Sequence, residues 1–245
     1  MKNKFIHIIL DNLKTLIGAL IIALIIRSFI LQPFYIPSSS MEPTLLVGDR
    51  IFVTKYSYGY SKHSFPFSPN FSNKRFFAKT PQQGDLVVFK TPADNRTDYI
   101  KRLIGLPGDI IQFVNGELFI NNVVVPREET NLSEPVRCGS LTINTKTFIE
   151  TLPNGVQHLA SYNKVGTLQN TKKFKVPQNH YFLMGDNRDC SKDSRFLNDV
   201  GYVKNLNLVG KAKVIFFSND TLKGSLLKIW NLHNSLRVKR TFKFI

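Results

Sequence analysis

The sequence predicts a mostly β domain that follows one N-terminal membrane helix. An apolar stretch, residues 15–34, would extend about 30 Å as a helix, which is the thickness of a bilayer core. Beyond Pro37, short runs of β-branched and aromatic residues are broken by Gly, Pro, Asn and Asp, while helical periodicity is weak. Asn115-Gly116 lies between two apolar runs and is typical of a tight hairpin turn.

The apolar stretch is predicted to span a membrane from residue 15 to residue 34, behind a short segment of residues 1–14. Its most apolar part, Leu16 to Ile26, is shorter than a bilayer, so a span requires Arg27 to extend its side chain toward one interface. A cleaved signal peptide has a similar layout of basic, apolar and small residues. Because no Ala-x-Ala follows and Arg27 interrupts the apolar run, we favour a retained anchor.

Charge on the two sides of the span predicts its orientation. Lys2, Lys4 and Lys14 precede it, whereas residues 35–54 contain a single basic side chain, Arg50. Short loops rich in Lys and Arg stay in the cytoplasm. The sequence therefore predicts a single-pass protein of the cytoplasmic (inner) membrane, with a cytoplasmic N-terminus and the bulk of the chain on the extracytoplasmic, periplasmic side.

Net charge and cysteine content bear on partners and cofactors. The formal net charge of +16 suits nucleic acid, but the basic residues are spread along the whole chain, so we predict a lipid bilayer and no nucleic acid as partner. Cys138 and Cys190 form no Cys-x-x-Cys or Cys/His cluster, so no metal is expected. The two are able to pair in an oxidising compartment, which the sequence alone leaves open.

Three segments lie outside the predicted strands. Residues 56–83, rich in Tyr, Phe, Ser and Pro, fit either a loop or hairpin extension at the membrane interface or a disordered excursion. Residues 127–177 are polar and weakly patterned, which indicates a smaller inserted domain or a set of long loops. Residues 221–245 are basic and fit either an amphipathic surface helix or a terminal packing helix. The predicted strands are Arg50 to Lys55, Asp85 to Lys90, Tyr99 to Ile104, Ile110 to Val114, Leu118 to Val125, His180 to Met184 and Lys211 to Ser218.

The first candidate for chemistry follows the anchor directly. The chain reads PSSSMEPTL from Pro37 to Leu45. A Ser-rich stretch bounded by prolines is typical of a linker, so this motif alone does not indicate a nucleophile.

The second candidate is a lysine in an apolar strand. In the run DYIKRLIGLPGD, from Asp98 to Asp109, strand alternation places Tyr99, Lys101 and Leu103 on one face. Burial disfavours the charged ammonium and lowers the pKa of a lysine, which then accepts a proton near neutrality. A lone lysine in a strand is nevertheless more often an edge residue.

The third candidate is the polar run GDNRDCSKDSR, from Gly185 to Arg195. Its hydroxyls are able to orient an amine, and the Asp-x-Arg spacing of Asp193 and Arg195 allows an internal ion pair that braces the loop. A plain surface loop has a similar composition.

In this order, the three runs resemble the motifs of bacterial type I signal peptidases, and the similarity extends from Arg27 to about Ser218. The resemblance implies a mostly antiparallel β catalytic domain, residues 35–109 and 178–220, with a smaller inserted β domain, residues 110–177. It also implies a membrane-bound serine endopeptidase that removes signal peptides from exported preproteins without a cofactor. We expect it to act as a monomer.

The resemblance assigns a role to each matching residue. Ser40 is expected to be the nucleophile and Lys101 its general base. Ser38 is expected to supply a hydroxyl to the oxyanion hole beside the backbone N–H of Ser40, and Ser191 to orient the Lys101 amine. The residues expected to brace the site are Asp193, Arg195 and Arg102. The residues expected to wall shallow pockets for small substrate side chains are Phe34, Ile36, Met41, Tyr99 and Ile100.

Two other functions fit parts of the sequence. A penicillin-binding protein or β-lactamase carries Ser-x-x-Lys, which occurs at residues 161–164 and 225–228, but neither match is accompanied by Lys-Thr-Gly or Ser-Asp-Asn. A non-catalytic membrane-anchored binding module would keep the fold and lose the chemistry. Every residue that the resemblance requires for catalysis is present, which favours the enzyme.

Overall fold

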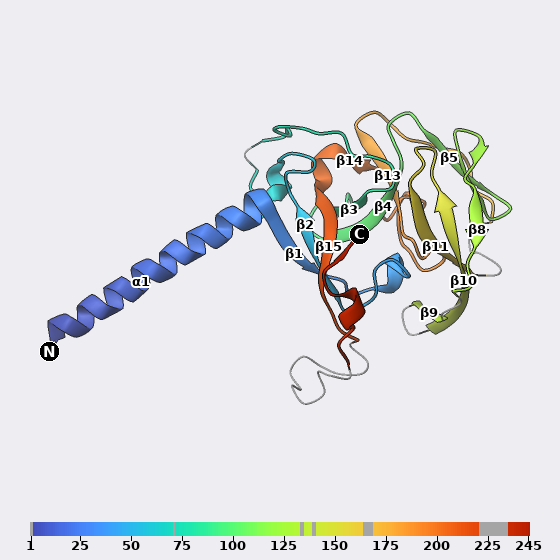
Figure 1. Cartoon of the computed structure of the whole chain (residues 1–245). Helices are drawn as coiled ribbons and strands as arrows, with labels where there is room; N and C mark the ends of the chain where they lie inside the picture. Colours follow the sequence, from blue (N-terminus) through green and yellow to red (C-terminus); the bar gives the residue numbers. More distant parts are fainter. Residues whose placement is uncertain (1, 71, 133–134, 139–140, 164–168, 221–234) are drawn as a thin grey trace.

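The structure is a computed structural model that describes residues 2–70, 72–132, 135–138, 141–163, 169–220 and 235–245. One long helix, α1 (Lys2–Ile25), projects away from a β body and carries the N-terminus at its far end (Figure 1). A π-helical turn, Ile26–Ile30, continues it, and the segment Ile9–Ile30 is long and apolar enough to cross a membrane. Apolar side chains of α1 such as Leu16 and Ile22 are exposed and do not pack against the body. This arrangement fits a single-pass membrane protein.

The helix ends before the boundary that the sequence predicts. Residues 31–34, placed within the span 15–34, belong instead to strand β1 (Leu31–Tyr35). Pro33 supplies the reason, because proline lacks an N–H, clashes with the preceding helical turn and biases Gln32 toward extended backbone. β1 pairs with β2 (Asp49–Thr54), so the chain passes directly from the membrane helix into a sheet.

The central sheet has eight strands in the order β1-β2-β15-β3-β4-β13-β14, with β16 beside β15. Its pairings are antiparallel. β4 is an interior strand, and its second half is buried. The remaining strands of this sheet are β3 (Leu86–Lys90), β4 (Asp98–Gly105), β13 (His180–Met184), β14 (Val203–Lys204), β15 (Leu208–Ser218) and β16 (Lys243–Phe244).

Two smaller antiparallel sheets form between β4 and β13, in the orders β11-β10-β8, with β9 paired to β10, and β12-β5-β6-β7. The stretch 127–177 is thus rich in strands. Its pattern is weak because polar side chains such as Thr145, Thr147 and Glu150 are buried on β10. The division into a catalytic and an inserted domain stays a prediction. The strands are β5 (Ile110–Val114), β6 (Glu117–Ile120), β7 (Val123–Val124), β8 (Arg127–Glu129), β9 (Pro135–Cys138), β10 (Leu141–Thr151), β11 (Gln157–Asn163) and β12 (Phe174–Lys175).

The predicted hairpin at Asn115-Gly116 is confirmed. Both residues have positive φ, 50° and 76°, as a two-residue hairpin turn requires, and they join β5 to β6. The predicted strands Ile110–Val114 and His180–Met184 have the observed bounds. The strand predicted from Leu118 to Val125 is instead divided between β6 and β7, because residues 121–122 turn the chain with positive φ.

Two core clusters support the regions on either side of β4. One combines Phe182 and Met184 of β13 with Phe113 and Leu118, so the inserted strands share a core with the central sheet. The other combines Met41 with residues of β2, β3 and β15. The chain that follows β1 is therefore held against the central sheet.

Residues 56–83 lie beside the end of the membrane helix. The ring of Phe29 makes edge contacts with Tyr60 and Phe65, at centroid distances of 5.5 and 5.4 Å. The Tyr60 hydroxyl donates a hydrogen bond to the Phe29 carbonyl (2.9 Å), and Tyr60 forms an antiparallel bridge with Phe76. Of the two interpretations given to this segment, its described part matches an extension and not a disordered excursion.

The basic C-terminal segment, 221–245, is described only from Ser235 onward, and residues 221–234 of the predicted helix lie outside the described residues. A short 3₁₀ turn, Val238–Arg240, leads into β16. The Arg240 guanidinium forms an ion pair with buried Asp49 (2.6 Å). For residues 236–245 the helix prediction is therefore wrong, because β pairing and ion pairs within the domain hold this part of the chain.

Candidate active site

Ser40 lies in a short connection between β1 and β2. The connection contains a 3₁₀ turn, Ser39–Met41, which Ser38 precedes with extended backbone. Met41 and Leu45 are fully buried and fix the turn on the core. The turn holds the Ser40 side chain in a position that is only 7% exposed.

Lys101 reaches Ser40 from the middle of β4. Its Nζ lies 2.5 Å from Ser40 Oγ, and the Lys101 side chain is buried. Burial is the main cause that lowers the pKa of Lys101 to about 8; Arg195 lowers it further, while Asp193 and Asp186 raise it. The expectation that this lysine is a buried residue of an apolar strand is confirmed, and with a pKa of about 8 roughly a tenth of its amine is neutral at pH 7.

The loop after β13 holds the backbone of the serine turn. Asn187 donates from its backbone N–H to the Ser40 carbonyl (3.2 Å) and from Nδ2 to the Ser39 carbonyl (3.2 Å). Gly185 permits this approach, since a Cβ there would lie 2.3 Å from Ser191 Oγ and 2.4 Å from the Ser40 carbonyl oxygen. Asn187 was not among the predicted site residues, although its place in the run GDNRDCSKDSR was the available signal.

Two buried ion pairs brace the site. Arg102 donates Nε and a terminal nitrogen to the two Asp186 carboxylate oxygens, at 2.8 and 2.6 Å, and Arg195 makes the same bidentate contact with Asp193 at 2.8 and 2.8 Å. Although burial acts to raise them, the pKa values of Asp186 and Asp193 are held below the usual range by these arginines. The predicted Asp-x-Arg pair is confirmed. Asp186, the partner of Arg102, was missed because nothing local links strand β4 to the later loop.

Ser191 occupies the expected neighbourhood without the expected contact. Its hydroxyl is buried and, within the described part of the chain, makes no hydrogen bond of normal geometry. It lies close enough to Asp193 to be among the groups that lower the pKa of that carboxyl. The Lys101 amine donates its hydrogen bond to Ser40 Oγ and not to Ser191. The role of Ser191 in orienting this amine therefore stays a prediction.

A cavity of about 290 Å³ opens beside Ser40 and Lys101. Four of the predicted substrate-binding residues line it, namely Phe34, Ile36, Tyr99 and Ile100. Met41 does not line it. This assignment is corrected, because the Met41 side chain is fully buried in the core cluster and has no accessible surface. Ser38 completes the polar end of the cavity, with its hydroxyl 3.4 Å from Ser40 Oγ.

The two cysteines, whose state the sequence left open, form a disulfide. It joins Cys138 at the end of β9 to Cys190, which immediately precedes Ser191. The Cys190 N–H also donates to Asn187 Oδ1 (3.3 Å). The disulfide therefore ties the loop that supports Ser40 to one of the smaller sheets.

A further buried network of hydrogen bonds was not predicted from the sequence. Arg188 donates to Glu150 (2.6 Å) and to the Tyr162 hydroxyl (2.8 Å), which anchors the same loop to β10 and β11. His158 lies beside it, and burial is the main cause that lowers the pKa of His158 to about 4. Polar residues of the inserted strands thus support the loop from behind.

The rival Ser-x-x-Lys motifs gain no support. Ser161 is fully buried, and its hydroxyl bonds to Thr147 (3.2 Å). Lys164 and residues 225–228 lie outside the described residues.

A serine hydroxyl bonded to a buried lysine, beside an apolar cavity in a β domain that follows an apolar helix, is the arrangement of a membrane-anchored serine peptidase.

A family model described as signal peptidase, peptidase S26, matches residues 9–217. The signal peptidase I of Rickettsia typhi (strain ATCC VR-144 / Wilmington) is 42% identical over 241 residues, which cover 91% of this chain and 88% of that protein. The signal peptidase I of Rickettsia bellii (strain OSU 85-389) is 39% identical over 250 residues, which cover 94% and 83%. The crystal structure of a signal peptidase I from Enterococcus faecalis V583 is 26% identical, covers 54% of this chain and 97% of that chain, and has a TM-score of 0.32.

The chain belongs to the signal peptidase family, peptidase S26. It is a serine endopeptidase that removes signal peptides, and the resemblance found in its sequence is confirmed.

Proposed function

We propose that Ser40 and Lys101 catalyse signal-peptide cleavage as nucleophile and general base. The observation that carries the proposal is the buried 2.5 Å contact between Lys101 Nζ and Ser40 Oγ. The neutral amine takes the Ser40 proton as Ser40 Oγ attacks the scissile carbonyl carbon. The resulting ammonium returns the proton to the leaving amine, and Lys101 then activates the water that hydrolyses the acyl-enzyme. Cleavage of a model preprotein in detergent by the wild type and by Ser40→Ala tests this assignment, and equal turnover would reject it.

The same proposal places the oxyanion hole at the Ser38 hydroxyl and the Ser40 backbone N–H. The hydroxyl of Ser38 lies 3.4 Å from Ser40 Oγ, so it is near the carbon that Ser40 would attack. The phenyl and aliphatic side chains of Phe34, Ile36 and Ile100 support a preference for small residues at the first and third positions before the cut.

Ser38→Ala is expected to lower kcat by about 10²- to 10³-fold with little change in KM, because the hydroxyl acts on charge that develops only in the transition state. Steady-state kinetics on a preprotein measure both constants. Ser38→Thr, which keeps a hydroxyl, is the matched control and should retain most of the activity. A Ser38→Ala enzyme with wild-type kcat would remove Ser38 from the oxyanion hole.

Activity is expected to rise with pH because only the neutral Lys101 amine accepts a proton. Its pKa is about 8, so the competent fraction falls about tenfold per pH unit below that value and levels off above it. The measurement is kcat/KM against pH, up to the alkaline range where the protein unfolds. A flat profile between neutrality and mildly alkaline pH would exclude Lys101 as the base.

We further propose that the N-terminus is cytoplasmic, that the catalytic domain lies on the extracytoplasmic side of the cytoplasmic (inner) membrane, and that the enzyme works as a monomer at the bilayer surface. The bias of Lys2, Lys4 and Lys14 toward the N-terminal side of the span supports this orientation. The Cys138–Cys190 disulfide supports an oxidising compartment for the β body. The antiparallel strands between β4 and β13 support an inserted domain over residues 110–177.

A further inference from the structure

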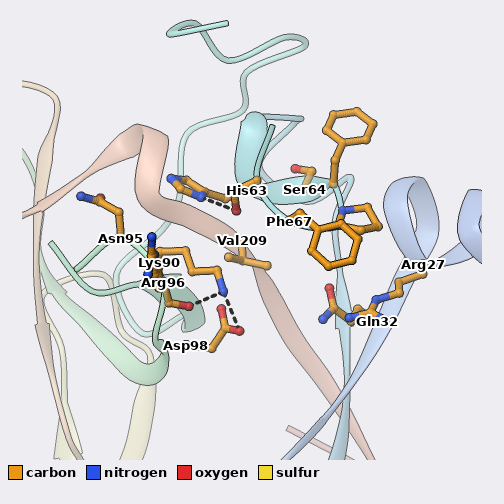
Figure 2. A pocket seen from close by; sticks show the side chains of 13 residues that line it. Arg27, Gln32, His63, Ser64, Phe67, Lys90, Asn95, Arg96, Asp98 and Val209 are labelled. Carbon is orange, nitrogen blue, oxygen red and sulfur yellow. Dashed lines mark hydrogen bonds and ion pairs between the residues drawn. The ribbon is translucent and has the colours of Figure 1, made fainter. Parts of the chain in front are cut away.

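A second cavity, of about 320 Å³, lies where the membrane helix meets the β body. Residues from separate parts of the chain line it: Arg27 from the end of the helix, Gln32 from β1, residues 63–68 from the extension, Val209 from β15, and Lys90 with its neighbours around the turn between β3 and β4. Figure 2 shows Arg27 and Phe67 on one side of this cavity and Lys90, Arg96 and Asp98 on the other. It is distinct from the cavity at Ser40, with which it shares only Asp98 among its lining residues.

Positive charge predominates in this cavity. Among the described residues that line it, Arg27, Lys90 and Arg96 are cationic and Asp98 is the one carboxylate. Asp98 already forms an ion pair with Lys90, with 2.9 Å between Oδ2 and Nζ, and Lys90 Nζ also donates to the Arg96 carbonyl (2.6 Å). Neither Arg27 nor Arg96 forms an ion pair with any residue that the structure describes. Two guanidinium groups therefore remain for an anion.

The positive charge around the cavity also acts on the titratable groups beside it. The pKa of His63 is lowered to about 4 by burial and then by Lys62 and Lys90, so this side chain is neutral. The pKa of Lys55, behind the cavity, is lowered to about 8 by burial, and although Asp98 opposes this, Arg27 and Lys90 lower it further. An anion placed among the cationic groups would relieve this mutual repulsion.

The position of the cavity restricts what that anion is. Arg27 belongs to the apolar segment Ile9–Ile30, so its guanidinium stands where a membrane-spanning helix leaves the hydrocarbon. Aromatic side chains gather at the same level: Phe29 packs on Tyr60 and Phe65, and the Phe67 side chain is fully exposed. Exposed aromatic and basic residues are favoured at the headgroup level of a bilayer.

We propose that this cavity binds the phosphate of an anionic phospholipid headgroup, with Arg27, Lys90 and Arg96 as its ligands and Phe67 against the adjoining lipid. The proposal gives the extension 56–83 a function, since its residues 63–68 close one wall of the site. It does not depend on the roles assigned to Ser40 and Lys101.

The test uses the full-length protein in a neutral detergent and titrates it, by calorimetry, with short-chain phosphatidylglycerol, short-chain phosphatidylcholine and inorganic phosphate. The wild type is expected to bind phosphatidylglycerol more tightly than either other probe. Arg27→Gln/Arg96→Gln should weaken that binding about twentyfold, and the single Arg96→Gln about fivefold. Both side chains are exposed and form no ion pair with a described residue, and equal thermal unfolding midpoints check that the variants fold.

Lys172→Gln/Lys175→Gln is the matched control, because it removes two charges from exposed lysines outside the cavity. It should bind phosphatidylglycerol as the wild type does. Equal binding by the wild type and Arg27→Gln/Arg96→Gln, or an equal loss in the control, would overturn the site. If inorganic phosphate bound as tightly as phosphatidylglycerol, and with the same dependence on Arg27 and Arg96, the ligand would be free phosphate and the lipid assignment would fail.

Discussion

Ser40→Ala is expected to lower kcat/KM for a preprotein by about 10³-fold or more, because the substitution removes the atom that attacks the scissile carbonyl. The fold should remain, since Ser40 Oγ contacts only Lys101 Nζ and the Ser38 hydroxyl among the hydrogen bonds of the described residues. The measurement is single-turnover cleavage in detergent, which separates chemistry from product release.

Ser161→Ala is the matched control for this variant. Ser161 is also a buried serine, and it belongs to the rival Ser-x-x-Lys motif, but its hydroxyl bonds to Thr147 and not to a lysine. Ser161→Ala should cleave at nearly the wild-type rate. The reverse result, with Ser161 required and Ser40 dispensable, would contradict the proposed nucleophile.

Lys101→Met is expected to cause a loss of similar size, because methionine fills the space and cannot accept a proton. The nucleophile and its base act as a unit, so the double variant Ser40→Ala/Lys101→Met should be no worse than either single variant by more than a small factor. Thermal unfolding should show no loss of stability, since the substitution removes a buried amine whose charged form burial disfavours.

Lys55→Met controls for the burial of a lysine. Lys55 is 1% exposed, its pKa is also lowered to about 8, and its Nζ donates to the Ser64 carbonyl (3.2 Å), not to a nucleophile. Its loss should leave the pH profile of cleavage in place. If Lys55→Met shifted that profile and Lys101→Met retained activity, the assignment of the general base would be wrong.

The anchor and several strands were accessible to sequence reasoning because lipid and sheets impose local patterns. A bilayer requires a continuous apolar run, which the segment Ile9–Ile30 supplies. The Asn115-Gly116 turn follows from the φ values that only a few residue types tolerate. The predicted anchor boundary is wrong at residues 31–34 because hydropathy alone does not mark the end of a helix, whereas Pro33 does.

The strands between β7 and β13 were not predicted from the sequence because several of their buried side chains are polar. Thr145, Thr147 and Ser161 are buried but polar, so β10 and β11 lack the alternation that identifies a half-buried strand. The Thr147 and Ser161 hydroxyls bond to each other, and the Ser161 backbone bonds to Asp186 and Arg188 in the loop after β13, so these partners come from segments that no local window contains. Met41 was misassigned for a related reason, because nothing in the motif distinguishes a residue that walls a cavity from one that packs beneath it.

By itself, the sequence determined the β class, the single anchor and the family, and it selected Ser40 and Lys101 as candidates. Only the tertiary structure decided that these two atoms lie 2.5 Å apart across 61 positions of chain, that Asp186 pairs with Arg102, and that Cys138 is bonded to Cys190. It also decided that Arg27 and Arg96 face one cavity beside the membrane helix. The local hydrophobic pattern of a segment indicates which of its side chains are buried. Distances between side chains that are remote in the sequence are set only when the sheets assemble.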